Sequence, residues 1–142
     1  MIELPKLYGL ITSRRKEGCF GVLFNQKKEE FAVFLTRTFG PENQILVDVG
    51  EHHCIKSFYY KGGYPTFEII VPGHTKILFH ELNWAFQSEG CVGIAESFDV
   101  IAGKVGIGGS LHGFSEFWNS YKEFPEFTFL VEEFIWPNRR QG

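Results

Sequence analysis

Hydrophobic and polar residues alternate along much of this chain, and a period of two is typical of β-strands with one buried face. The alternating runs are rich in aromatic and β-branched residues, which favour pleated structure. Polar or Gly- and Pro-containing stretches, such as residues 25–30 and 39–44, separate them and predict turns. The predicted strands cover residues 6–13, 19–25, 30–38, 53–60, 66–71, 76–80, 91–95 and 127–136.

One segment has helical spacing instead. Apolar residues recur at positions 111, 114, 117, 118 and 121, which predicts an α-helix over about residues 110–123. Ser110 is the expected N-cap and Pro125 the residue that prevents continuation. The glycine-rich stretch before it, residues 103–110, is expected to be a flexible connection. Its Lys104 precedes the glycines, the wrong order for a phosphate-binding loop.

The chain is expected to form a single domain over residues 1–142, because its length suits one core and no repeat or linker interrupts it. The 16 Phe, 5 Tyr and 3 Trp residues predict an aromatic core. The predicted fold is mainly β: a curved sheet or partly closed β-barrel of about seven to nine strands with one packed helix.

Charge and composition argue against several classes of protein. A net charge of −3 offers no broad positive field, so nucleic acid is not an expected partner. No signal peptide and no long apolar run are visible, so we expect no membrane span and a chain that is cytoplasmic when made. Three widely spaced cysteines, at positions 19, 54 and 91, favour reduced thiols over a disulfide framework.

The main candidate for chemistry is the pair of His80 and Cys91. If residues 76–80 and 91–95 form adjacent antiparallel strands, the two side chains lie opposite each other, and the imidazole can promote thiolate formation. The main-chain amides of Gly90 and Cys91 are then candidate oxyanion donors. Glu89 and Asn83 are candidates to orient the imidazole or the substrate. The alternative is structural: a buried thiol near a histidine that ends a strand.

The stretch VPGHTKILFHELNWAFQSEGCVGIA, residues 71–95, resembles the signature of an uncharacterised domain family of phage and bacterial proteins, and the likeness extends over roughly residues 40–120. That family is similar to the catalytic domains of L,D-transpeptidases. The resemblance implies that His80 is the base, that Ser88, Gly90 and Cys91 form the nucleophile element, and that His74 makes a polar contact near the site. Where L,D-transpeptidases usually carry an arginine two residues after the cysteine, this chain has Gly93.

Two functions are therefore expected as alternatives. The first is cysteine-dependent acyl transfer or amide hydrolysis on cell-wall peptide, without a cofactor, by a protein that is carried in the virion or released on lysis. The second is a non-catalytic structural or binding module, for example a phage tail or baseplate component that contacts other phage structural proteins. A metal site is not expected, because His52 and Cys54 would need ligands from His74, Cys19 or His112 in distant segments.

Overall fold

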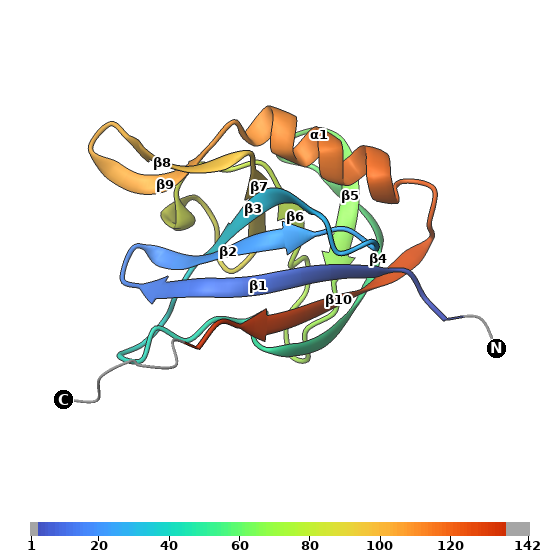
Figure 1. Ribbon diagram of the computed structural model, residues 1–142, viewed down its shortest axis with the longest axis horizontal. Helices are drawn as coiled ribbons and strands as arrows, with labels where there is room; N and C mark the ends of the chain where they lie inside the picture. Colours follow the sequence, from blue (N-terminus) through green and yellow to red (C-terminus); the bar gives the residue numbers. More distant parts are fainter. Residues whose placement is uncertain (1–2, 136–142) are drawn as a thin grey trace.

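The computed structural model describes residues 3–135 (Figure 1). Within them lie ten strands, one α-helix and one short 3-10 helix, and no helix is both long and apolar enough to cross a membrane. The elements are β1 (Lys6–Arg15), β2 (Gly18–Phe24), β3 (Glu30–Thr36), β4 (Gly50–Tyr59), β5 (Tyr64–Ile69), β6 (Phe79–His80), η1 (Ala85–Gln87), β7 (Val92–Ala95), β8 (Ser97–Ile101), β9 (Lys104–Gly108), α1 (Ser110–Tyr121) and β10 (Glu126–Glu133).

Eight of the strands form one curved sheet in the order β5-β4-β10-β1-β2-β3-β7-β6. The two end strands approach each other, and a single bridge between Glu68 and Leu78 joins them, so the sheet is a nearly closed barrel with one seam. Neighbouring strands are antiparallel except for the pairs β1–β10 and β6–β7, which are parallel. The predicted mainly β fold, a partly closed barrel with one packed helix, is confirmed.

Strand β10 lies inside the sheet and not at one of its ends. It pairs with β1 on one side and β4 on the other. Its alternate residues Phe127, Phe129 and Val131 point into the barrel and are buried. The predicted run extended to Trp136, which lies outside the described residues.

The barrel interior is filled by aromatic rings, as the composition predicts. Phe79 packs against Phe117, Phe127 and Phe129 with ring centroids 4.9, 6.0 and 5.3 Å away. Helix α1 lies across the top of the barrel in Figure 1 and contributes its buried face to the same core. The strands leave room for these rings at glycines: a Cβ on Gly21 would lie 2.3 Å from the ring of Phe34.

Two local predictions around the helix were wrong. Residue Gly109, in the left-handed conformation at φ 71°, is the N-cap, and Ser110 is already the first helical residue. The glycine-rich stretch is not a flexible connection, because residues 104–108 form β9, which pairs with β8 as a hairpin. The reason is Ile107, which is fully buried in a second hydrophobic cluster with Phe20, Leu82 and Ala95 between the hairpin and the outer face of the barrel.

Candidate functional site

The strands that carry the candidate pair are parallel, and the expected antiparallel hairpin is wrong. Phe79 is paired with Val92, and His80 is paired with Gly93, so Cys91 lies next to Leu78. Residues two apart on neighbouring strands at a spacing of about 4.8 Å have Cα atoms about 8 Å apart. His80 and Cys91 are thus diagonal neighbours, and the alternation of Phe79 and Val92 into the core leaves both on the outer face of the barrel.

The connection between these strands explains their direction. Residues 81–91 cross from the end of β6 back to the start of β7 through the short helix η1. Leu82 and Ala85 in this connection are buried in the second hydrophobic cluster, so the segment packs on the barrel wall and does not turn back at once. A parallel neighbour requires such a crossover, whereas a hairpin leaves its loop in solvent.

A shallow cleft of about 210 Å³ lies beside the seam of the barrel and brings the candidate residues together. Four of the predicted residues line it: His80, Ser88, Glu89 and Cys91. The other lining residues are Tyr59, Lys61, Phe86 and Gln87. Tyr59 and Lys61 come from the end of β4 and the turn after it, on the other side of the seam.

Cys91 is the one cysteine of the three that solvent reaches. Cys19 and Cys54 are both 0% exposed, and burial raises the pKa of each thiol, that of Cys19 to about 12. The sulfur of Cys91 accepts a hydrogen bond from the Leu78 amide at 3.3 Å and donates one to the Lys76 carbonyl at 3.5 Å. Both partners are main-chain groups, and within residues 3–135 no hydrogen bond joins this sulfur to the His80 ring.

His80 is 3% exposed, and burial lowers its pKa, which favours the neutral imidazole. Its Nδ1 lies 2.7 Å from the Glu81 carbonyl oxygen. Because a carbonyl only accepts hydrogen bonds, Nδ1 carries the proton and Nε2 is the basic nitrogen. The ring stacks on Tyr59, with centroids 4.5 Å apart and planes inclined by 12°. The imidazole is therefore fixed in orientation and able to accept a proton.

Ser88 holds the backbone next to the cysteine. Its Oγ accepts hydrogen bonds from the amides of Gly90 at 3.2 Å and Cys91 at 2.8 Å. The Thr36 hydroxyl donates to the Gly90 carbonyl at 3.3 Å. The two amides considered as oxyanion donors thus converge on one oxygen atom, and in this conformation that oxygen is the serine hydroxyl.

Of the other predicted residues, Glu89 lines the cleft but is paired with a residue outside it, and Asn83 and His74 lie away from the cleft. Glu89 forms an ion pair with Arg37 at 2.6 Å. The Asn83 side chain donates to the Ile107 carbonyl at 2.9 Å, so it ties the connection to β9, and it does not line the cleft. His74 is exposed on the turn after β5 and does not line the cleft either.

Sequence reasoning missed Tyr59 and Lys61. Burial raises the pKa of the Tyr59 hydroxyl, and Tyr59 lines the cleft together with Cys91. The available signal was the turn at residues 60–63, whose two glycines predict a tight hairpin tip. What the sequence did not contain is the position of that tip next to β6, since the two are brought together only when the barrel closes.

The alternative metal ligands are not gathered. His52 Nε2 contacts the Asp48 carbonyl at 2.5 Å, His53 pairs with Glu126 at 2.5 Å, and Cys54 is buried. In the described part of the chain, no group of three or more His, Cys, Asp or Glu residues is arranged to hold a metal ion.

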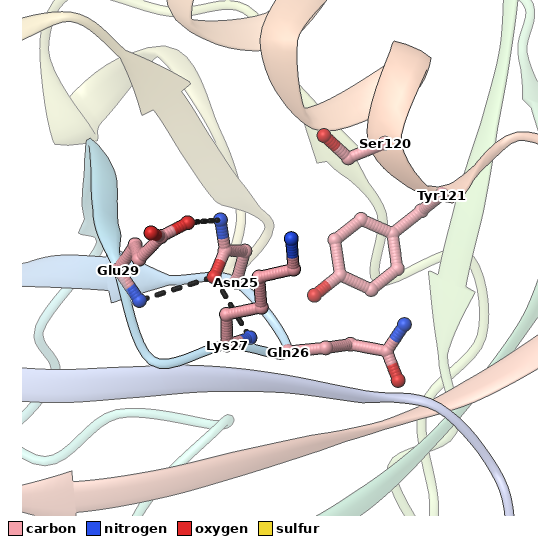
Figure 2. A pocket seen from close by; sticks show the side chains of 6 residues that line it. All are labelled: Asn25, Gln26, Lys27, Glu29, Ser120 and Tyr121. Atoms are coloured by element: carbon pink, nitrogen blue, oxygen red, sulfur yellow. Dashed lines mark hydrogen bonds between the residues drawn. The ribbon is translucent and has the colours of Figure 1, made fainter.

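A second hollow, of about 270 Å³, lies between the β2–β3 turn and the end of α1 (Figure 2). Figure 2 shows Lys27, Ser120 and Tyr121 around it, and the Asn25 side chain bonded within the turn. Asn25 Oδ1 accepts hydrogen bonds from the main-chain amides of Lys27 at 2.9 Å and Glu29 at 3.0 Å, so it stabilises the turn. Neither a thiol nor an imidazole lines this hollow.

Comparison of the chain with models of protein families, with the sequences of curated proteins and with solved structures found no match in any of the three. The resemblance to the phage and bacterial domain family, and through it to L,D-transpeptidases, therefore stays a prediction.

Proposed function

We propose that this protein is a cysteine-dependent acyl-transfer or amide-hydrolysing enzyme with Cys91 as nucleophile and His80 as base. The observation that carries the proposal is the shared cleft: the one solvent-accessible thiol of the chain and a buried neutral imidazole line the same hollow. Accessible thiols beside a base are the usual arrangement of cysteine nucleophiles. The resemblance to L,D-transpeptidases points to cell-wall peptide as the substrate.

The proposed reaction begins when His80 Nε2 takes the proton of the Cys91 thiol and the sulfur attacks the carbonyl carbon of an amide. A carbon–sulfur bond forms, and the carbonyl oxygen becomes an oxyanion. When the intermediate collapses, the carbon–nitrogen bond breaks and His80 returns the proton to the leaving amine, which leaves a thioester on Cys91. A second amine, or water, then attacks the carbonyl carbon of the thioester and gives a proton to His80. The carbon–sulfur bond breaks, the new amide or acid is released, and His80 returns the proton to the sulfur, which restores the Cys91 thiol.

The oxyanion has a specific place in this scheme. The amides of Gly90 and Cys91 both point to the position that Ser88 Oγ fills. An oxyanion held there has to replace the hydroxyl, which requires rotation of the Ser88 side chain. The Leu78 amide donates to the Cys91 sulfur and not to this position, and its hydrogen bond favours a negatively charged sulfur.

The test combines labelling with activity. Cys19 and Cys54 are too buried to serve as reference thiols, so the rate of Cys91 alkylation by iodoacetamide is compared with that of a small peptide thiol at the same pH. We expect iodoacetamide to label Cys91 faster than the peptide thiol, and to label Cys91 more slowly in His80→Gln than in native protein. We also expect native protein, but not Cys91→Ala, to cleave or exchange a peptidoglycan stem peptide. If native protein and Cys91→Ala leave the peptide equally unchanged, the enzymatic proposal is wrong.

A second candidate is a non-catalytic module, for example a component of a phage tail or baseplate. The observation that favours it is the resting hydrogen bonding of Cys91, whose sulfur is bonded to the main chain of Lys76 and Leu78. Exposed apolar side chains on and near the β8–β9 hairpin, among them Phe86, Phe98 and Val100, offer a surface for assembly. Labelling of Cys91 at the rate of the peptide thiol, unchanged in His80→Gln, is the result expected of this candidate.

A further inference from the structure

We propose that Lys61 recognises a negatively charged group of the substrate, so that the acyl donor carries an anion, such as a carboxylate, close to the bond that is attacked. This inference rests on the proposed function and names the substrate class for the same cleft. It starts from Lys61, which lines the cleft with Cys91 although it comes from the opposite side of the seam.

The turn that carries Lys61 is held against the site. The Gly63 amide donates to the Tyr59 carbonyl at 2.7 Å, which closes the turn. Gly62 packs closely against two aromatic rings: a Cβ at this position would be 2.5 Å from the Tyr64 ring and 2.6 Å from the Tyr59 ring. Tyr59 in turn stacks on His80, and Lys61 and His80 line the same cleft. Burial lowers the pKa of His80, the hydrogen bond to Glu81 opposes this, and the Lys61 charge adds a smaller lowering, which agrees with a lysine near the imidazole.

The charges around the cleft leave Lys61 as its unpaired cation. The one carboxylate among the lining residues, Glu89, is paired with Arg37 at 2.6 Å. Within residues 3–135, Lys61 has no ion-pair partner. Lys76 does not line the cleft, and its ammonium group contacts the Ser57 hydroxyl at 3.5 Å and the Tyr60 ring. An anion that enters the cleft therefore meets one uncompensated positive charge.

Position 93 cannot supply this charge. A Cβ on Gly93 would lie 2.1 Å from Leu82 Cγ, so an arginine side chain has no room there. The cation for an anionic substrate has to come from another element, and the β4–β5 turn is the one that reaches the cleft.

The first experiment measures the local potential at Cys91 without any assumption about catalysis. Iodoacetate and iodoacetamide alkylate the same thiol, but only iodoacetate is anionic, so the ratio of their rates reports the charge near the sulfur. In Lys61→Gln we expect the iodoacetate to iodoacetamide ratio to fall about twofold or more, the effect of removing one unit charge from within about 10 Å in a largely aqueous setting. Lys61→Arg should keep the ratio, and Lys27→Gln, the same change beside the hollow of Figure 2, should not alter it. Added salt should shrink the difference between native protein and Lys61→Gln.

The outcomes separate the two proposals. A ratio that is the same in native protein and Lys61→Gln overturns the role of Lys61, even if Cys91 is highly reactive. Slow reaction of Cys91 with both reagents contradicts the enzymatic proposal, yet the ratio still reports on Lys61. If the stem peptide is a substrate, Lys61→Gln should raise KM for a peptide with a free terminal carboxylate more than for its amide, with kcat little changed.

Discussion

The packing of Gly93 against Leu82 provides a test in which one substitution has opposite effects in two backgrounds. In the native protein, a Cβ on Gly93 would lie 2.1 Å from Leu82 Cγ and 2.5 Å from Cδ1. We expect Gly93→Ala to lower the free energy of unfolding by about 1–3 kcal/mol, the usual cost of overpacking. Leu82 is 5% exposed, and Leu82→Ala should cost about 2–3 kcal/mol because it leaves a cavity.

The double variant is the informative one. The three atoms closest to a Cβ on Gly93 are all atoms of Leu82 that alanine lacks, so the clash disappears in Leu82→Ala. Gly93 does not have a positive φ, and alanine in a strand then restricts the unfolded chain, which should stabilise the Leu82→Ala background by about 0.5–1 kcal/mol. Urea unfolding of the four proteins measures these values.

A control comes from Leu35, which belongs to the same hydrophobic cluster but is not among the nearest atoms to that Cβ. In a Leu35→Ala background, Gly93→Ala should therefore remain destabilising. An equal cost of Gly93→Ala in the native, Leu82→Ala and Leu35→Ala proteins would refute the steric explanation for glycine at this position.

Three further predictions concern the core and the site. Gly21→Ala should destabilise the protein by about 1–3 kcal/mol in urea unfolding, because its Cβ would lie 2.3 Å from the Phe34 ring, and Phe34→Leu should relieve part of that cost. Burial lowers the pKa of His80 below its unfolded value of about 6.5, so the unfolded chain binds a proton at a higher pH than the folded protein does. The free energy of unfolding should therefore fall as the pH drops below about 6.5. The difference in this free energy between native protein and His80→Gln should be smaller at pH 5 than at pH 7.5. Thr66→Val removes the hydroxyl that donates to the Phe79 carbonyl at 2.6 Å and should lower the free energy of unfolding by about 1–2 kcal/mol in the same assay. An unchanged free energy of unfolding would contradict a stabilising role for this bond.

Much of the fold could be predicted from the sequence because the barrel strands bury alternate residues, and burial of alternate residues is visible as a period of two. The hairpin at residues 97–108 was missed because glycines at positions 103, 106 and 108 obscured the alternation of Val105 and Ile107. The direction of β7 was missed for another reason. Apolar residues at positions 82 and 85 were read as loop residues, although their burial is what makes the connection a crossover.

The candidate site was predictable only in part, because some of its residues are close in sequence and others are brought together only by the closed barrel. His80, Ser88, Glu89 and Cys91 lie within one short segment, so local sequence contains the information that groups them. Lys61 joins them across the seam between β5 and β6, where no regular ladder forms. Which strands end at the seam is decided by the closure of the whole sheet, and no short pattern in the chain encodes it.

The seam also explains where the buried polar side chains lie. Within residues 3–135, the buried polar or charged residues are Thr36, Thr66, His80 and Ser88, and each of them hydrogen-bonds to main-chain groups of residues 79–91. Burial of a polar group is costly unless it is bonded, and these side chains lie where the backbone ladder is incomplete and main-chain groups need partners. Their hydrogen bonds hold the backbone of an irregular segment in place. The proposed nucleophile and base require backbone held in this way, because small displacements of reacting groups reduce rates strongly.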